Sequence, residues 1–338
     1  MPHLVSLISD QPIPNLLFIQ SVEQEVEGYI FISTSQMEKK QRTHWLKKAA
    51  DLPEERCRTI EVEANNYFSI IASLKIHLTD FLNSFIVNIT GGNKLMMLAC
   101  FNFFKELNCT QIYYKSLENN SFYNVIEPTG TSYSCPNIDI ISYLTAYGLQ
   151  FTSSEPTFDI SVSNKIFKYY TSIGFNRTLF LNSYWFSSSM LAENYLTGGW
   201  FEDFLYYNLR KFLSLNSKNL LFQTKLNSET LPDTPALEFD LIFLKNDRLV
   251  IIEAKSSINT ISVDAKSPIG QMIYKLGAVK QLFGLKVTAY LVTLSSLNKL
   301  NNNQLVSLNE KLNLVGIKLI NQTYFKSQDQ IKRFITNL

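Results

Sequence analysis

The residues of this sequence whose types and spacing could do chemistry together are Asp240, Glu253 and Lys255. They lie in two apolar runs rich in Leu, Ile, Val and Phe that Asn246-Asp247 separates. Both of these residues tolerate the positive φ of a two-residue hairpin loop. With that loop, Asp240 lies directly opposite Glu253, and alternation of side chains puts Lys255 on the same face. The sequence therefore predicts two carboxylates and one amine on the polar face of a hairpin.

Two carboxylates placed opposite each other destabilise a sheet unless a cation lies between them. Because carboxylate oxygens are the ligands that Mg²⁺ and Mn²⁺ prefer, we expect one of these metals at the pair. The alternative is an ordinary solvated face, since Glu-x-Lys should occur by chance about once in a chain with 18% charged residues. The acidic residue on the paired strand, in register, favours the metal.

The flanking residues predict the elements that must position this hairpin. An amphipathic helix should begin near Gly198, and another should begin at Pro268. The strands expected around them are residues 220–226, 237–244, 249–255 and 286–293. The resulting αβββαβ order resembles the core of the restriction endonucleases. Gln271 and Lys275 share a face of the second helix and could contact a phosphate, or they could simply be solvated.

Strand-like and helix-like patterns alternate through the first 130 residues. This alternation predicts βαβ units and a mostly parallel, doubly wound sheet, in which ligands bind outside the carboxyl ends of the strands. Two loops fit that position, residues 9–15 and residues 90–94. In the second loop, Gly91 and Gly92 would let backbone amides approach a phosphate beside Lys94, or they would only form a tight turn.

Both halves together resemble the CRISPR-associated Rossmann fold (CARF) nucleases, ancillary nucleases of type III CRISPR systems with a PD-(D/E)XK hairpin. The resemblance rests on the Ile-Ser-Asp-Gln-Pro-Ile-Pro-Asn and Thr-Gly-Gly-x-Lys loops followed by the hairpin. It implies a homodimer that senses a cyclic oligoadenylate, most often the tetramer, and cuts nucleic acid. The implied ligand-binding residues are Ser9, Asp10, Gln11, Asn15, Thr90, Gly91, Gly92, Asn93 and Lys94. Asn93 departs from the threonine that is common in the family.

The same resemblance completes the metal site and the mechanism. Glu202, in the first helix of the αβββαβ core, is placed where the family often has a further acidic ligand. The alternative is that Glu202 is only an acidic residue near the helix N-terminus, where the helix dipole favours negative charge. The Ala254 carbonyl is the other implied ligand. Lys255 would then orient a water molecule or stabilise the negative charge that develops on the phosphate.

These patterns divide the 338 residues into three parts: a Rossmann-like sensor at 1–150, a linker or helical connector at 151–197, and a nuclease domain at 198–338. Residues 201–338 carry 17 Lys and Arg against 11 Asp and Glu, a modest excess that suits a phosphodiester substrate. Four cysteines and three histidines form no zinc-site spacing. Nothing resembles a signal peptide or a membrane span, so we expect a cytoplasmic protein.

We therefore expect a metal-dependent nuclease, activated by a cyclic oligoadenylate, that cleaves single-stranded DNA or RNA or nicks duplex DNA. Loops such as residues 227–235 would select among these substrates. One alternative is a CARF regulator that binds nucleic acid without cleaving it, and another is an unregulated restriction or repair nuclease. The in-register carboxylates argue against the first alternative. The second would keep the hairpin but give residues 90–94 no ligand, so cleavage measured with and without added messenger distinguishes it.

Overall fold

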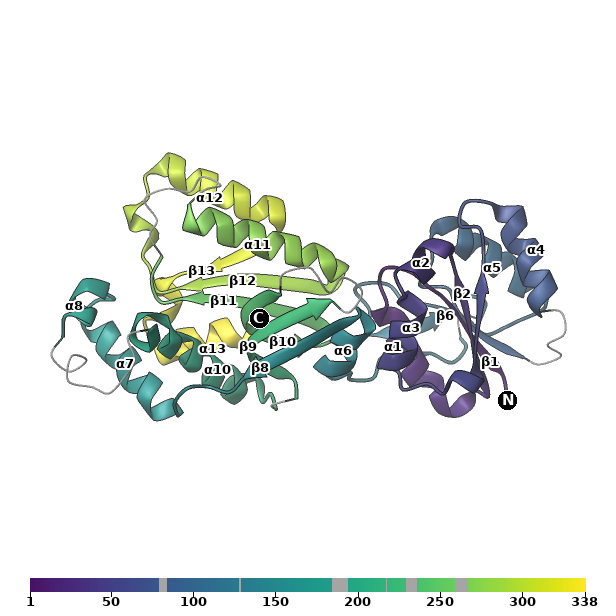
Figure 1. Cartoon of the computed structure of the whole chain (residues 1–338), viewed down its shortest axis with the longest axis horizontal. Coiled ribbons are helices and arrows are strands. Elements are labelled where there is room, and N and C mark those ends of the chain that lie inside the picture. The colour runs from purple at the N-terminus through teal and green to yellow at the C-terminus, as the bar shows by residue number, and fades with distance from the viewer. Residues whose placement is uncertain (79–83, 128, 184–193, 217, 229–235, 259–266) are drawn as a thin grey trace. The chain divides into compact units, whose positions relative to one another are not determined.

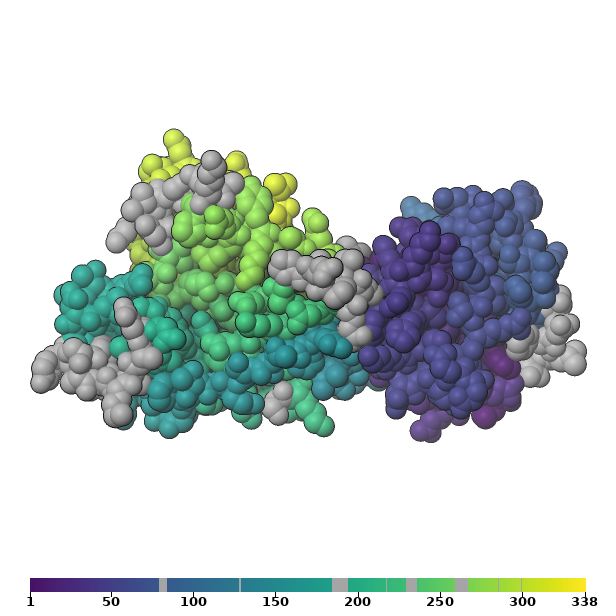
Figure 2. Space-filling model, in the orientation of Figure 1, coloured from purple at the N-terminus to yellow at the C-terminus, as the bar shows by residue number. Residues whose placement is uncertain are grey.

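The computed structural model describes residues 1–78, 84–127, 129–183, 194–216, 218–228, 236–258 and 267–338 (Figure 1). Most of the 227–235 loop expected to select the substrate lies outside these residues. Contacts divide the chain into two compact units, one of residues 1–150 and one mainly of residues 151–226 and 236–338. In the space-filling view the first unit is purple to blue, and the second is teal to yellow (Figure 2). Among the described helices, none has both the length and the apolarity that crossing a bilayer requires.

The first unit is built on a seven-stranded sheet with the order β3-β2-β1-β4-β5-β6-β7. Neighbours from β3 to β5 are parallel, whereas β6 and β7 are antiparallel additions. The strands β1, β2 and β4 are almost entirely buried, as expected for a parallel sheet covered by helices on both faces. The elements are β1 (His3–Leu7), α1 (Ile13–Val22), β2 (Gly28–Ser33), α2 (Ser35–Lys39), α3 (Arg42–Ala49), β3 (Cys57–Glu61), α4 (Tyr67–Leu78), β4 (Phe85–Asn88), α5 (Lys94–Glu106), β5 (Ile112–Tyr114), β6 (Ser121–Asn124), β7 (Tyr133–Ser134) and α6 (Ile140–Ala146).

The second unit is built on a six-stranded sheet with the order β13-β12-β11-β10-β9-β8. Helices α7, α10 and α13 contribute to the apolar core on one face, and α11 and α12 lie over the other (Figure 1). The elements are β8 (Leu149–Ser154), α7 (Ile160–Ser172), α8 (Arg177–Leu181), α10 (Trp200–Leu213), β9 (Leu220–Ser228), β10 (Leu237–Lys245), β11 (Arg248–Lys255), α11 (Pro268–Leu282), β12 (Val287–Thr293), α12 (Asn302–Val315), β13 (Ile317–Ile320) and α13 (Gln328–Thr336). The mixed α/β fold and the αβββαβ order are as the sequence predicts.

The predicted hairpin register is confirmed. Leu241 pairs with Ile252 and Lys245 with Arg248, so two residues form the loop. Asn246 and Asp247 adopt φ angles of 51° and 56°, the left-handed conformation that a type I′ turn requires. The apolar face of the hairpin is buried in the core beneath α10.

The segment expected to be a connector, residues 151–197, is instead integrated into the second unit where it is described. Strand β8 forms the edge of the second sheet. Helix α7 packs against α10, with the Phe167 and Phe204 rings stacked 4.1 Å apart. Residues 152–157 are rich in Ser, Thr and Pro, a composition typical of linkers, and composition does not report tertiary contacts. Residues 184–193 of this segment lie outside the described residues.

Candidate functional site

Strands β10 and β11 bring the three predicted residues of the hairpin together. The Lys255 Nζ lies 2.9 Å from Glu253 Oε1 and 3.2 Å from Asp240 Oδ2. The Ala254 backbone N–H donates to Asp240 Oδ2 at 2.6 Å, which orients this carboxylate. Glu253 is 6% exposed, so most of the cluster is shielded from water. The ammonium group therefore occupies the position between the two carboxylates where the sequence predicts a cation.

Burial and mutual repulsion set the charge states of this cluster. Burial, followed by the charges of Glu253 and Glu202, raises the pKa of Asp240 to about 7. Burial alone would lower the pKa of Lys255, but Asp240 and Glu253 outweigh it and raise that pKa above its usual value. Lys255 therefore stays protonated, whereas neutral pH lies close to the pKa of Asp240.

Glu202 reaches this cluster from the first turn of α10. Its pKa is raised, mainly by burial and also by the charge of Glu253, while Gln223 and Lys255 act in the opposite direction. The Gln223 Nε2 donates to Glu202 Oε2 at 2.9 Å. The next residue, Asp203, is completely buried and accepts hydrogen bonds from two backbone amides and from Tyr195. The two neighbouring acids of α10 thus have different partners: Glu202 interacts with the hairpin carboxylates, whereas Asp203 does not.

The sequence reasoning missed Gln223. This residue lies within β9 yet has a φ of 41°, a left-handed conformation that is uncommon for a non-glycine residue. Its neighbours pair regularly with β10, Phe222 with Leu241 and Thr224 with Phe239, so Gln223 falls opposite Asp240. Backbone strain of this kind persists where the surrounding structure enforces it, and it is concentrated at functional sites. No feature of sequence spacing distinguishes Gln223 from the other polar residues of this strand.

A pocket of about 530 Å³ opens beside the carboxylates. Its lining combines Glu253 and Lys255 with Gln271 and Lys275 of α11. The Lys275 Nζ lies 3.6 Å from Glu253 Oε2. Of the two interpretations of Gln271 and Lys275, the structure therefore favours the one in which they face the reacting centre.

The donor set of this site fits a divalent cation. The Glu253 Oε2 is buried and accepts no hydrogen bond from a described residue. Burial first, and then the charges of Glu253 and Glu202, raise the pKa of Asp240, and a bound cation would lower it. Within the described ranges, no three His, Cys, Asp or Glu side chains converge closely enough to form a metal centre by themselves. In this arrangement a metal ion would therefore depend on Asp240 and Glu253, and the Glu202 carboxylate would join them only after a shift of its side chain.

The first unit places its two predicted loops side by side. Strands β1 and β4 are parallel neighbours, and their chains continue into α1 and α5 respectively. Because β1 lies between β2 and β4, the connections diverge there, and this is the topological switch point of the sheet. Both loops, and the N-termini of both helices, lie at the carboxyl edge of this strand pair. Helix N-termini favour anions.

Asn15 joins the two loops from inside. It is 1% exposed, and its Nδ2 donates to Leu7 O at 2.8 Å. The Asn88 Nδ2 donates to Asn15 Oδ1 at 2.8 Å, and the Asn88 side chain in turn accepts the Thr90 N–H. Asn15 was predicted to line the ligand site, but its buried amide instead holds the two loops together.

The glycines of the second loop have a packing role. A Cβ on Gly91 would lie 1.9 Å from Leu7 O, so only glycine permits this approach of the loops. Gly92 has a φ of 71°, which glycine adopts without strain. Asn93 caps α5 by accepting the Met96 N–H and also donates to Ala64 O. The Asn93 side chain is thus occupied by the protein, whereas Lys94 is exposed at the start of the helix.

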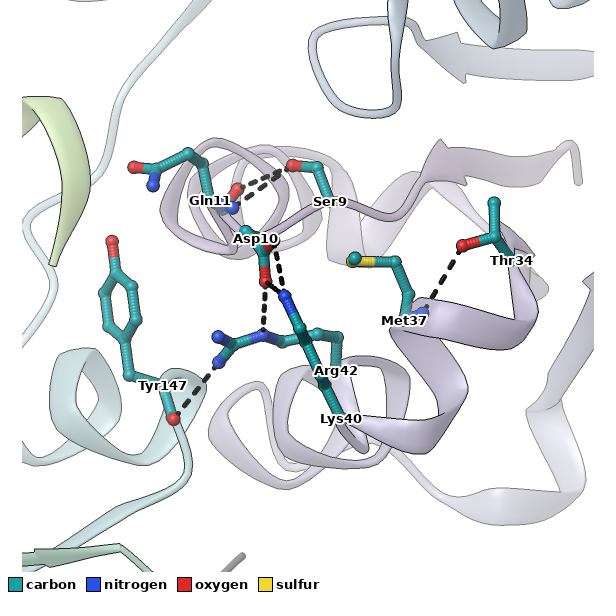
Figure 3. A network of polar contacts seen from close by, with 8 residues as sticks. All are labelled: Ser9, Asp10, Gln11, Thr34, Met37, Lys40, Arg42 and Tyr147. Carbon is teal, nitrogen blue, oxygen red and sulfur yellow. Dashed lines mark hydrogen bonds and ion pairs between the residues drawn. The ribbon is translucent and has the colours of Figure 1, made fainter. Parts of the chain in front are cut away.

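Asp10 is the centre of an ion-pair network that the sequence did not predict (Figure 3). Lys40 Nζ lies 2.8 Å from Asp10 Oδ2, and Arg42 Nε lies 3.2 Å from Asp10 Oδ1. Burial opposes ionisation of Asp10, but these two cations outweigh it and lower its pKa. The Arg42 guanidinium also donates to Tyr147 O at 3.2 Å. Two cations around one carboxylate leave a net positive charge beside the first loop.

Ser9 and Gln11 form the turn that presents Asp10. The Ser9 Oγ accepts the Gln11 N–H at 3.2 Å, and the Gln11 side-chain amide points away from the ion pairs (Figure 3). The structure places all nine residues predicted for the ligand site at one edge of the sheet. Asn15 and Gly91 are buried, and the other seven are exposed at least in part.

The first unit is a doubly wound domain with two helix N-termini at its switch point, and the second is an αβββαβ domain with clustered carboxylates. This combination is typical of two-domain nucleases with a ligand-binding module. Family models give the more particular assignment. The Card1 CARF domain matches residues 3–143, and the Card1-like endonuclease domain matches residues 190–323. Together the two matches cover most of the chain, which therefore belongs to the Card1-like CARF nucleases.

Solved structures share this fold at low sequence identity. Can2 from Sulfobacillus thermosulfidooxidans, in complex with cyclic tetra-adenylate, is 20% identical with a TM-score of 0.74, and 99% of each chain is covered. Protein VC1899 from Vibrio cholerae is 15% identical with a TM-score of 0.73, over 99% of this chain and 97% of that one. A type III CRISPR defence DNA nuclease activated by cyclic oligoadenylate is 15% identical with a TM-score of 0.55, over 87% of this chain and 45% of that one. No curated protein sequence matched the chain.

Proposed function

We propose that this protein is a metal-dependent nuclease of type III CRISPR defence that a cyclic oligoadenylate activates. The observation that carries the proposal is the cluster of Asp240, Glu253 and Lys255 at one end of an endonuclease-domain hairpin. The match of the first unit to a CARF domain supports control by a cyclic oligoadenylate. The likeness to a Can2 structure containing cyclic tetra-adenylate favours that ring size.

Asp240 and Glu253 hold Mg²⁺ or Mn²⁺ in this proposal, with the Ala254 carbonyl and Glu202 as additional oxygen ligands. A bound metal would polarise the scissile phosphate and lower the pKa of a bound water molecule. Lys255, held cationic by its carboxylate partners, stabilises the negative charge that develops on the phosphate. Gln223 positions the Glu202 carboxylate through its hydrogen bond.

In the first unit, the messenger phosphates lie over the edge formed by the loops after β1 and β4. Thr90, Lys94 and the N-termini of α1 and α5 supply hydrogen-bond donors and positive potential. Lys40 and Arg42 add the charge that Asp10 does not neutralise. A symmetric ring is best bound by two copies of this edge, so we propose that the active protein is a homodimer.

Activation requires the messenger to bind the cleaving arrangement of the protein more tightly than the resting one. The expected signature is low cleavage without messenger and strong cleavage with it. Purified protein should be incubated with Mn²⁺, labelled single-stranded DNA or RNA, and cyclic oligoadenylates of different ring sizes. Equal cleavage with and without every messenger would contradict the regulated model. Full activity of Glu253→Gln would contradict the proposed catalytic centre.

A further inference from the structure

We infer that a second pocket, walled by the end of α7 and by α8, receives an unpaired nucleotide next to the scissile phosphate. This inference rests on the proposed nuclease function and deepens it, because it assigns a substrate contact to residues 170–178. These residues lie between the two family-model matches, which end at residue 143 and resume at residue 190. The pocket has a volume of about 560 Å³, within the usual range for small-ligand sites.

The second pocket adjoins the catalytic pocket. Ser257 and Ile258, just after the end of β11, line both pockets and form the wall between them. Two hydrogen bonds fix this wall: Ser256 Oγ donates to Thr197 O at 2.7 Å, and the Ile258 N–H donates to Ser295 Oγ at 2.7 Å. A nucleic acid strand with its scissile phosphate at Glu253 would therefore have a preformed polar pocket for its neighbouring nucleotide.

The chemistry of the lining suits a nucleotide. Hydroxyl and amide groups predominate, including those of Asn176, Ser296 and Gln322, and Arg177 supplies a cation. Among the described residues that line this pocket, none is an Asp or Glu. An arginine guanidinium suits a phosphate, and neutral donors and acceptors suit a sugar or the edge of a base.

An aromatic residue in a strained conformation also lines this pocket. Phe175 follows Gly174 after the end of α7, and both have positive φ angles, 58° and 67°. Glycine tolerates this conformation, whereas a bulky residue rarely adopts it, and such strain is concentrated at functional sites. The Phe175 ring packs edge-on against Tyr170, 5.8 Å between ring centres, and is half-buried. Bases of single strands bind by stacking on aromatic side chains, and Phe175 places one in the lining of this pocket.

An unpaired nucleotide fits this arrangement better than a base pair. The pocket is a recess whose lining includes the buried Tyr170, so a base must leave a duplex in order to enter it. A strand with an unpaired nucleotide next to its scissile phosphate can therefore occupy this pocket, whereas a continuous duplex should bind and be cleaved poorly.

The test measures binding by the full-length protein carrying Glu253→Gln, with cyclic tetra-adenylate and Mn²⁺ present. Fluorescence anisotropy follows labelled single-stranded DNA, single-stranded RNA and duplex DNA. Arg177→Ala should weaken single-strand binding about tenfold or more, as expected for a lost hydrogen bond to a charged group. It should also reduce the slope of log K against log salt by about 0.7, the value for one phosphate contact on a single strand.

Two further variants separate a bound nucleotide from a general effect of charge. Thr178→Trp, an exposed change that fills the pocket, should weaken binding without altering the salt slope. Lys168→Ala removes an exposed cation from α7 outside the pocket and should leave affinity and slope unchanged. Equal losses in Arg177→Ala and Lys168→Ala, or unchanged binding in Thr178→Trp, would overturn the inference. So would equal affinity for duplex DNA.

Cleavage by the protein with an intact catalytic site distinguishes a failure of the proposed function from a failure of the second-pocket inference. Absence of messenger-dependent cleavage would refute the proposed function itself. Messenger-dependent cleavage with an unchanged KM in both Arg177→Ala and Thr178→Trp would refute only the second pocket. The expected result is a raised KM in these two variants, while the messenger concentration for half-maximal activation stays the same.

Discussion

Replacing Asp240 by Asn should make the metal-free protein more stable at alkaline pH. The carboxylate lies in a cluster with Glu253 and Glu202, and burial with this repulsion raises its pKa from 3.8 to about 7. Asn keeps an oxygen that can accept the Ala254 N–H, so the main change is the loss of a charge that the folded protein disfavours. Removal of metal by EDTA exposes this effect fully.

The sign and size follow from proton linkage. Between about pH 4 and pH 7 the folded protein binds more protons at Asp240 than the unfolded chain, so the free energy of unfolding falls as pH rises. With the cited pKa values, this fall amounts to about 2–3 kcal/mol between pH 5 and pH 8. The wild type should lose this amount, and Asp240→Asn should not.

Urea denaturation in EDTA, followed by tryptophan fluorescence across this pH range, measures the effect, since Trp200 lies in the core of the second unit. Glu238→Gln is the matched control. Glu238 lies on the same strand, is paired with Lys225 at 2.8 Å and has a lowered pKa, so its titration falls at more acidic pH. The reasoning is refuted if the stability difference between the wild type and Asp240→Asn is the same at pH 5 and pH 8.

Three other changes test the two sites. Gly91→Ala forces a Cβ to within 1.9 Å of Leu7 O, so calorimetry should find that cyclic tetra-adenylate binding is lost and that thermal stability is lowered. The control is Gly198→Ala, whose added Cβ meets nothing within 4 Å and which should change neither property. Gln223→Gly relieves the positive φ but removes the hydrogen bond to α10, so thermal stability should be retained while cleavage falls about tenfold; full activity would contradict the positioning role. Lys255→Ala removes the cation between the partly buried Asp240 and the buried Glu253. A thermal melt should therefore show lower stability that Mn²⁺ restores, while messenger-stimulated cleavage stays absent.

The sequence was sufficient for features that depend on local chain geometry. Asn246-Asp247 fixes a two-residue turn, and alternation along the strands then determines which side chains share a face, so the register of Asp240 and Glu253 followed from counting. Buried strands alternating with helices likewise required a parallel, doubly wound first unit. In such a sheet the loops after β1 and β4 lie at the same edge.

Only the tertiary structure decided features that depend on contacts between distant segments. Glu202 and Asp203 are adjacent acids, yet packing of α10 buries the second and directs the first toward the hairpin. Asn15 looked like a ligand donor, but its amide joins two loops that are far apart in sequence. Residues 151–197 looked like a linker, because composition reports local flexibility and not the stacking of Phe167 on α10. Periodicity and turn chemistry are properties of neighbours in the chain, whereas burial and hydrogen-bond partners are determined by the whole fold.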